Sequence, residues 1–500
     1  MYKTASILLV HPSTNKKAPL SSTIAKSEHL GLAYLSSALN YSNLSCRIID
    51  LESQPGTPLE LANQVETEGI KLVGFSPTSL SAANANEIMC EIKKKCHDVI
   101  FVWGGHLATG LGMQTFNSVP LLDALVLGDG IPVISILVET VEKQRGLPKH
   151  PQVLVNPTST LPIVSKYQQH CAPTWTDIMP TRYLSSSKYK RHGARILTSL
   201  GCPYECSFCT TPFIYGQRRT LRSLSHIISE IRFLHNNLGV KRIWINDDLF
   251  LDGSMANHQR ACNFAREIHN IDPELRFRPL CRPDSFEKYP DTLKTLIACG
   301  MDTIFVGLES GDNSTLTELN KRVSLHTSID FVREIRKENV HLQIGFIMFT
   351  PFATTTSLRR NVEFLYDIGE LYRMFPVTRT VLAFPGTALW NSLHENDNID
   401  KNRSTPFLTY PKFLNNNVMQ LSLAFELSEE DFAEFDGFIY ERNLCGKLPK
   451  KTHQELSKMI RKKIHDAITA AENGAQASNI RNLVKVMLPK LNIIAGSSFK

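Results

Sequence analysis

The sequence lacks long apolar runs. No stretch reaches about 18 residues without a charge, the length that predicts a membrane-spanning helix, so no membrane span is expected. The opening segment, MYKTASILLVHP, is too short and too quickly polar for a secretory signal, and it is predicted to be a first buried strand. These two absences predict a cytoplasmic protein.

A disulfide framework is absent as well. The 11 cysteines are an odd number scattered over 500 residues, unlike the dense and even pattern of small secreted proteins. In a reducing compartment such cysteines stay free to bind metal. The net charge of +7 is small for this length. It permits an anionic substrate or cofactor, but nucleic acid is not expected as a partner.

Residues 1–146 alternate short apolar runs with helical patterns. The predicted strands are 5–12, 46–53, 72–79, 99–106 and 123–130. Strands separated by helices predict a parallel, doubly wound sheet. Ligands of such sheets bind at the carboxyl ends of the strands.

The alternation stops and then resumes. Residues 147–192 hold six prolines and little periodicity, which predicts a linker. Residues 193–395 contain six strand-like runs with helical patterns between them, at 194–200, 241–247, 275–281, 303–309, 342–348 and 379–385. Six βα units predict a partial (βα)6 barrel, whose working face is the carboxyl end of its strands.

Residues 396–500 are predicted to form a small, mostly helical C-terminal domain. One of its helices is rich in Lys and Arg. A solvated basic face is the expected interpretation, and a nucleic-acid surface is the alternative. The predicted fold class is therefore α/β, with a doubly wound sheet, a partial barrel and a helical end.

The segment GCPYECSFC at 201–209 carries the strongest chemical signal. Cys202, Cys206 and Cys209 fit in one loop after the first barrel strand. Three thiolates can hold three irons of a [4Fe–4S] cluster, which normally takes four cysteines. The fourth iron is then open to a small chelating molecule, as a reactive metal site requires.

Spacing alone leaves two alternatives for these cysteines. A structural zinc site normally has four ligands, usually in CxxC pairs, and no second pair exists in the chain. The other alternative is a set of buried structural thiols. The open cluster accounts best for three closely spaced cysteines without a fourth.

The cysteine loop, with Phe208 before its last cysteine and six βα units around it, resembles the radical S-adenosylmethionine (SAM) superfamily. The resemblance implies that the open iron binds the amino and carboxylate groups of SAM. It also implies that an electron from a strongly reducing cluster cleaves SAM to a 5′-deoxyadenosyl radical. A small-molecule substrate and a reducing partner such as flavodoxin or ferredoxin are then expected.

The same resemblance suggests SAM contacts at the other strand ends. Asp247 and Asp248 follow the second strand, where a carboxylate suits the methionine ammonium. A helix N-cap at Asp248 is the alternative. Arg282 follows the third strand and is a candidate partner of the SAM carboxylate, or else a surface or structural arginine.

Glu309 and Ser310 end the fourth strand in GLESG, and the resemblance places them near the ribose and methionine of SAM. An ordinary strand-to-helix turn is the alternative. Gly345 opens GFIMFTP, which resembles the segment that lines adenine. The chain departs from the usual Gly-Glu-Thr there, but a backbone contact tolerates this.

The first 146 residues together with the barrel resemble cobalamin-dependent radical SAM enzymes. The matching segments run in order from EHLGLAYLSSAL (28–39) through VWGGHLAT (102–109) to VLGDG (126–130), and APTWTDIMPTRYL (172–184) also fits. The resemblance implies a cobalamin-binding-like domain. Methylthiotransferases, which need three N-terminal cysteines for a second cluster, fit less well. Cys90 and Cys96 lie six apart on one helical pattern and therefore face different ways.

The candidate cobalamin contacts lie at strand ends. Gly104 and Gly105 let the backbone approach a large flat cofactor, and Ser76, Thr78 and Gly128 lie at neighbouring strand ends. A plain set of turns is the alternative. The chain has no Asp-x-His-x-x-Gly segment here, so no histidine ligand to cobalt is expected.

Two further features concern cobalamin. His106 follows the glycine pair and is interpreted as a turn residue, not as a cobalt ligand. GDGI at 128–131 lacks the second acid of the usual Gly-Glu-Gly-Glu, which leaves a cobalamin-free member of the group as an alternative.

The predicted reaction is methyl transfer to an unactivated carbon or a similarly poor nucleophile. Two alternatives remain: a radical rearrangement, cyclisation or ring contraction, and a non-catalytic iron–sulfur or cobalamin sensor. The polar strand ends argue against the sensor.

Overall fold

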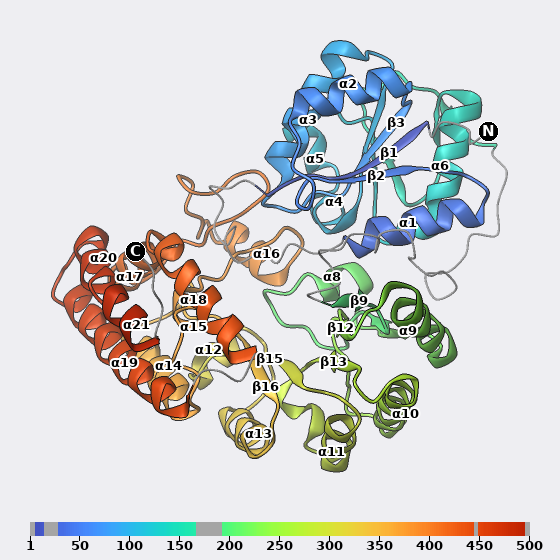
Figure 1. Ribbon diagram of the computed structural model, residues 1–500. Coiled ribbons are helices and arrows are strands. Elements are labelled where there is room, and N and C mark those ends of the chain that lie inside the picture. Colours follow the sequence, from blue (N-terminus) through green and yellow to red (C-terminus); the bar gives the residue numbers. More distant parts are fainter. Residues whose placement is uncertain (1–5, 15–28, 167–192, 445–448, 496–500) are drawn as a thin grey trace.

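The computed structural model describes residues 6–14, 29–166, 193–444 and 449–495. An α/β unit, blue to cyan in Figure 1, sits on one end of a green and yellow barrel, and a layer of orange and red helices covers the side of the barrel. No helix within the described ranges is long and apolar enough to cross a membrane.

The N-terminal sheet has six strands in the order β2-β1-β3-β4-β5-β7. Its strands are β1 (Ile7–His11), β2 (Arg47–Asp50), β3 (Leu72–Phe75), β4 (Ile100–Trp103), β5 (Ala124–Val126) and β7 (Val153–Val155). The first five pair in parallel and β7 pairs antiparallel with β5. The chain leaves β1 toward one edge and β3 toward the other, so a ligand crevice is expected at the carboxyl ends of β1 and β3. The predicted doubly wound sheet is confirmed.

Both faces of this sheet are covered by helices, and each face has its own core. The helices are α1 (Leu30–Tyr41), α2 (Pro58–Glu68), α3 (Ala82–Lys95), α4 (Gly105–Leu111), α5 (Gln114–Ser118) and α6 (Ile131–Gln144). Along β1, Leu8 and Val10 join one core, and Ile7 and Leu9 join the other. Because successive side chains alternate between faces, a strand covered on both sides is apolar throughout.

The proline-rich segment begins with structure that its sequence does not reveal. β6 (Leu147–Pro148) pairs with β8 (Ile163–Val164), and β7 between them completes the large sheet. Strands of two or three residues show no periodicity, which explains why this part is predicted as a linker. Residues 167–192, with the segment 172–184, lie outside the described residues.

The barrel consists of two three-stranded parallel sheets. Its strands are β9 (Ala194–Ile196), β12 (Arg242–Ile245) and β13 (Arg276–Arg278), then β14 (Leu280–Cys281), β15 (Thr303–Glu309) and β16 (His341–Phe346). The third predicted strand is split at Pro279, which lacks an amide donor. The sixth pairs through isolated bridges, a parallel one between Phe349 and Thr380 and an antiparallel one between Ala383 and Thr409. The partial barrel is confirmed, with a weakly paired last strand.

Helices on the outside connect the barrel strands. The long ones are α9 (Leu224–Leu238), α10 (Met255–Ile271), α11 (Pro290–Ala298), α13 (Leu325–Lys337) and α14 (Thr355–Asp367). The short ones are α8 (Thr211–Tyr215), η2 (Pro283–Phe286), α12 (Asn313–Glu318) and α15 (Phe375–Thr378). Hydroxyl side chains cap α9, α10, α13 and α14 by accepting from the first-turn amides.

The remaining residues are mostly helical, as predicted. The helices are α16 (Ala388–Glu395), α17 (Asn416–Glu426), α18 (Glu429–Leu444), α19 (Lys450–Glu472), α20 (Ala477–Lys485) and α21 (Leu488–Ala495). Leu456, Ile460 and Ile464 of α19 belong to the same hydrophobic core as the barrel. Lys458 and Lys462 are exposed. The basic helix therefore packs one face on the barrel and presents charge outward.

Candidate active site

The three motif cysteines lie in one loop between β10 (Ser199–Leu200) and α8. β10 pairs antiparallel with β11 (Thr220–Leu221), which closes the base of the loop. All three thiols are partly exposed. Burial, and then the neighbouring thiols of Cys206 and Cys209, raise the pKa of Cys202 to about 11. The loop thus gathers three thiols close enough to influence one another.

The arrangement of these thiols suits a cluster of several irons. No three Cys, His, Asp or Glu side chains of the described residues converge on a single metal ion. In a cubane each thiolate binds a different iron, so the thiols need to surround the cluster and not one point. Phe208 anchors the loop by packing in a small core with Val381 and Leu389.

Asp248 ties the two ends of the cysteine loop together. Its carboxylate accepts from the Gly201 amide and from the Thr211 hydroxyl, each at 2.9 Å. Gly201 has φ +86°, and a Cβ there would lie 2.1 Å from the Arg218 carbonyl oxygen. The N-cap of the next helix, α10, is Ser254, so the capping alternative for Asp248 is wrong.

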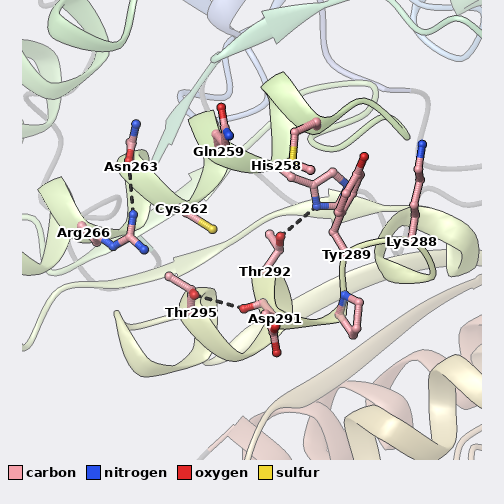
Figure 2. Close-up of a pocket in the computed structure, with 12 residues that line it drawn as sticks. His258, Gln259, Cys262, Asn263, Arg266, Lys288, Tyr289, Asp291, Thr292 and Thr295 are labelled. Carbon is pink, nitrogen blue, oxygen red and sulfur yellow. Dashed lines mark hydrogen bonds between the residues drawn. The ribbon is translucent and has the colours of Figure 1, made fainter.

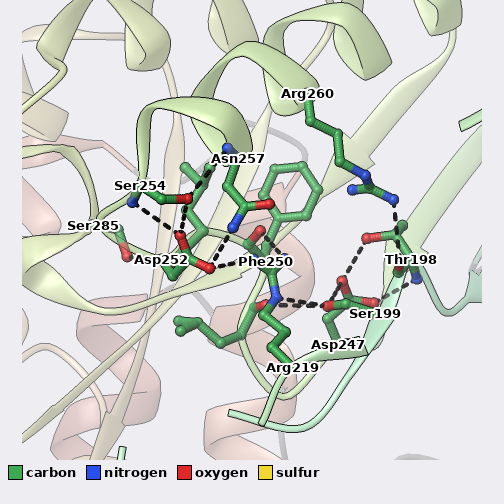
Figure 3. Close-up of polar contacts among 12 residues, drawn as sticks. Thr198, Ser199, Arg219, Asp247, Phe250, Asp252, Ser254, Asn257, Arg260 and Ser285 are labelled. Carbon is green, nitrogen blue, oxygen red and sulfur yellow. Dashed lines mark hydrogen bonds and ion pairs between the residues drawn. The ribbon is translucent and has the colours of Figure 1, made fainter. Parts of the chain in front are cut away.

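Asp247 points the other way. Its carboxylate is buried and accepts from the Thr198 amide at 2.6 Å and the Ser199 hydroxyl at 2.6 Å, as Figure 3 shows. Burial raises the pKa of Asp247, and these hydrogen bonds oppose the rise. Asp247 holds the strand that leads into the loop and is not part of the lining of the interdomain cavity. Asn246, beside it, does line the interdomain cavity described below.

Glu309 ends β15 in the left-handed region, with φ +63°. Its Oε1 lies 2.8 Å from Lys321 Nζ, and both side chains are nearly buried. A Cβ on Gly307 would lie 2.9 Å from that Nζ. In the parallel register Gly307 pairs with Gly345, so two residues without side chains leave room for the ion pair.

Ser310 is buried and uses its hydroxyl within the turn. It donates to Asn361 Oδ1 at 2.8 Å and accepts from the Asp312 amide at 3.1 Å. Asp312 in turn caps α12 through the Thr315 amide. These contacts agree with the alternative interpretation, in which Ser310 is part of an ordinary strand-to-helix turn.

Arg282 lies beside the cysteine loop, with 4% of its surface exposed. Its guanidinium stacks 3.7 Å from the centre of the Tyr204 ring and donates to Asp284 and to the Lys321 carbonyl, at 3.0 and 2.7 Å. The first contact lies within the cysteine motif. Tyr204 and Lys321 are missed in the sequence, because neither stands at a strand end.

A cavity of about 820 Å³ lies between the α/β unit and the barrel. The α/β unit contributes all five residues predicted to contact cobalamin: Ser76, Thr78, Gly104, Gly105 and Gly128. The barrel contributes Asp248, Asn246, Thr210, Tyr215, Phe384 and Pro385. The structure thus brings the strand ends of one domain and the base of the cysteine loop to the same space.

This cavity also extends between the sheet and helices α1 and α6. Leu9, Gly74 and Val102 line it from the sheet, and Leu35 and Ile134 line it from the helices. At its edge Gly105 has φ +86°, and a Cβ there would lie 2.9 Å from the Ser76 hydroxyl. The extension offers an apolar slot beside a backbone edge without side chains.

Three histidines line the cavity. The His29 ring accepts from the Leu32 amide at the start of α1 and lies 4.5 Å from the ring of His11. Burial, and then the neighbouring His11, lower the pKa of His29 to about 3. His106 lies in the first turn of α4, but its ring meets that of Tyr215 edge-on at 6.5 Å. It therefore reaches toward the barrel and is more than a turn residue.

A second, shallower pocket of about 530 Å³ lies on the outside of the barrel between α10 and α11 (Figure 2). His258 there shares a 2.9 Å hydrogen bond with Thr292, and its ring packs against Tyr289. The lining of this pocket includes none of the motif cysteines and none of the predicted cofactor contacts. The interdomain cavity is therefore the candidate active site.

Comparisons with known proteins agree with this geometry. The radical SAM superfamily model matches residues 196–365. An uncharacterised methyltransferase of Pyrococcus horikoshii is 27% identical over 399 residues, covering 78% of this chain and 83% of that protein. The hopanoid C-3 methylase of Methylococcus capsulatus is 24% identical, covering 77% of this chain and 72% of that protein.

Among solved structures, the cobalamin-dependent SAM radical enzyme OxsB with aqua-cobalamin bound superposes with a TM-score of 0.70 at 18% identity. The match covers 92% of this chain and 72% of OxsB. The barrel, residues 196–365, matches the radical SAM superfamily. The chain as a whole shares the fold of OxsB, with a doubly wound domain ahead of the barrel.

Proposed function

We propose that this protein is a cobalamin-dependent radical SAM methyltransferase that acts on an unactivated carbon, or a similarly poor nucleophile, of a small molecule. One observation carries the proposal. A single cavity is lined by the strand ends of the doubly wound sheet and by Asp248, which holds both ends of the cysteine loop. A substrate in this cavity can contact two reactive centres at once.

The residues around the cysteine loop fit a cluster and SAM. Cys202, Cys206 and Cys209 would hold three irons, and the Glu309–Lys321 pair and Arg282 lie beside the loop. We assign Asp247 and Ser310 to positioning, because their polar atoms are already bonded within the protein. Asp248 stays a proposed SAM-side residue because it also lines the cavity, and Glu309 and Arg282 stay because both act on Cys206. Gly345, opposite Gly307, remains the proposed backbone contact.

The residues of the sheet edge fit a corrinoid. Gly104, Gly105 and Gly128 would lie under the flat ring, and Ser76 and Thr78 offer hydroxyls at its edge. The apolar slot between the sheet and helices α1 and α6 suits a flat aromatic base. When bound, the cluster supplies the electron that cleaves SAM, and cobalamin supplies the methyl group.

The protein's own contribution is to hold the acceptor between the two sites. The Gly110 side of α4 approaches the barrel closely, since a Cβ there would lie 2.3 Å from the Pro385 carbonyl oxygen. On the barrel side Arg222 and Glu230 form a buried ion pair that reaches the Tyr34 hydroxyl of α1 at 3.3 Å. These contacts fix the two domains, and fixed geometry supplies much of the rate in such reactions.

The names of the relatives support methyl transfer. The first of them is described as a methyltransferase and the second as a methylase of a carbon position. We further propose flavodoxin or ferredoxin as the reductant, because Pro203 and the three cysteines give the loop a solvent-accessible side. The cytoplasm, where such reductants work, is the proposed location.

The test is anaerobic reconstitution of the whole protein, followed by spectroscopy. We expect about four irons per chain, a change of the reduced cluster's electron paramagnetic resonance (EPR) spectrum on adding SAM, and bound corrinoid visible by absorbance. The triple variant Cys202→Ala, Cys206→Ala, Cys209→Ala should lose the cluster, and the control Cys262→Ala should keep it. A spectrum that SAM leaves unchanged, or protein that binds no corrinoid, would contradict the proposal.

A further inference from the structure

Two polar side chains, one from each domain, face the interdomain cavity and have no hydrogen-bond partner within the described ranges. His106 is the second residue of α4 at the sheet edge, and Tyr215 ends α8, the helix that follows the cysteine loop. Among the described residues, neither the His106 ring nor the Tyr215 hydroxyl makes a hydrogen bond. The polar atoms of both side chains are also not among the atoms buried away from solvent. Both side chains line the cavity. Their hydrogen-bonding capacity is therefore available to a ligand.

Their position is between the two proposed reactive centres. α8 begins two residues after Cys209, and α4 begins at Gly105. The two rings meet edge-on with centroids 6.5 Å apart. A molecule that touches both rings is therefore within reach of the cysteine loop and of the sheet edge.

The charges nearby restrict what such a molecule can be. Asp248 acts electrostatically on both His106 and Tyr215, and Asp129 acts on Tyr215. The acidic residues of the cavity lining are Glu52, Asp129 and Asp248. Arg195 is the one arginine or lysine of the described lining, and it is already engaged within the protein. A carboxylate or phosphate beside Tyr215 would face carboxylates, with no free cation among the described lining residues, and its burial there is unfavourable.

Burial lowers the pKa of His106, which keeps the imidazole neutral near pH 7. A neutral imidazole offers one donor and one acceptor, and a phenol offers the same pair. Ile214, Leu107 and Phe384 add apolar surface to the same lining. The site therefore matches a largely apolar molecule with one uncharged or cationic polar group.

We propose that His106 and Tyr215 are the specificity-determining pair that hydrogen-bonds the polar group of the methyl acceptor, and that this group is a hydroxyl, amide or amine and not a carboxylate or phosphate. The proposal rests on the proposed methyltransferase function. It assigns the acceptor by chemical class and gives a role to a histidine outside the cofactor contacts.

The experiment uses the cobalamin-loaded, reduced whole protein with SAM that carries a trideuterated methyl group. Small molecules from cells that make the protein are separated by ion exchange into anionic, neutral and cationic fractions, and each fraction is offered as acceptor. We expect labelled product from the neutral or cationic fraction. Tyr215→Phe and His106→Phe should each lower the kcat/KM of labelling about tenfold, the effect of one lost hydrogen bond.

Controls separate recognition from damage. Both variants should keep the corrinoid absorbance and the SAM-dependent EPR change, because neither signal needs the acceptor. Tyr289→Phe, in the outer pocket of Figure 2, makes the same chemical change away from the cavity and should label at the normal rate.

Label in the anionic fraction, or normal labelling by both variants, would overturn the inference while leaving methyl transfer intact. If 5′-deoxyadenosine forms with an added fraction but no fraction gains label, methyl transfer itself is wrong and the inference falls with it.

Discussion

The Asp248 carboxylate accepts the Gly201 amide at 2.9 Å, one residue before the first motif cysteine. Its second oxygen accepts the Thr211 hydroxyl, two residues after the last. One side chain therefore closes the loop that carries all three thiols. Hydrogen bonds to a charged group contribute about 1.5–3 kcal/mol each.

We expect Asp248→Ala to loosen this loop. After reconstitution and desalting, iron should fall from about four to below two per chain. The control Asp291→Ala changes a fully solvated carboxylate on α11 and should keep the full iron content. Full iron retention in Asp248→Ala would show that the loop does not need this brace.

The Glu309–Lys321 pair should be essential for stability near the loop. Removing one member leaves a nearly buried charge without its partner, which costs about 3–5 kcal/mol. We expect Lys321→Met to lower the denaturant midpoint and to weaken the EPR response to SAM. The double variant Lys321→Met, Glu309→Leu should recover much of the stability but not the response. Equal stability of the single variant and the wild type would contradict the assignment.

Gly105 tests the sheet edge as a corrinoid site. At φ +86° an alanine is strained, and its Cβ would lie 2.9 Å from the Ser76 hydroxyl in the cavity wall. Gly105→Ala should weaken cobalamin binding at least tenfold, measured by absorbance titration. Gly112→Ala is the matched control, because Gly112 has φ +52° with nothing within 4 Å of its Cβ. If both variants weaken cobalamin binding equally, backbone strain and not the sheet edge explains the loss. If neither weakens it, the sheet edge is not the corrinoid site.

The pKa of His29 predicts acid sensitivity. The folded pKa of about 3 lies below the ordinary 6.5, so the unfolded chain binds a proton more readily. Stability is therefore complete above about pH 6.5 and is lost as the pH falls toward 3, by roughly 1–2 kcal/mol at pH 5. Protonation also removes the acceptor for the Leu32 amide.

His29→Asn keeps a capping acceptor and removes the titration. Its urea midpoint should change less between pH 7.5 and pH 5 than that of the wild type. An identical pH dependence in both proteins would show that other groups cause the acid loss.

Periodicity and motif spacing predicted much of this molecule. The parallel sheet follows from apolar runs that are buried on both faces, as in β1. The cysteine loop follows from local spacing, because three ligands within eight residues need no long-range information. The helical C-terminal residues follow from the loss of strand patterns, although their shared core with the barrel is a long-range property.

Side-chain direction at strand ends was not predictable. Asp247 and Asp248 are adjacent, yet one faces Thr198 and Ser199 and the other faces the cavity. Successive residues of a strand alternate in direction, and the sequence does not say which of the two points inward. Lys321 was missed because it meets Glu309 only after α12 turns the chain back. The contact of His106 with Tyr215 depends on how the two domains dock, which the sequence does not show.

The most direct test of the methyltransferase account is the stoichiometry of turnover with trideuteromethyl SAM and the acceptor. Methyl transfer to an inert carbon uses one SAM as radical source and another as methyl source. The account predicts 5′-deoxyadenosine and S-adenosylhomocysteine in about equal amounts, with the label in the product. Formation of 5′-deoxyadenosine with substrate but without S-adenosylhomocysteine or label would contradict it, and would favour a rearrangement or cyclisation in the same cavity.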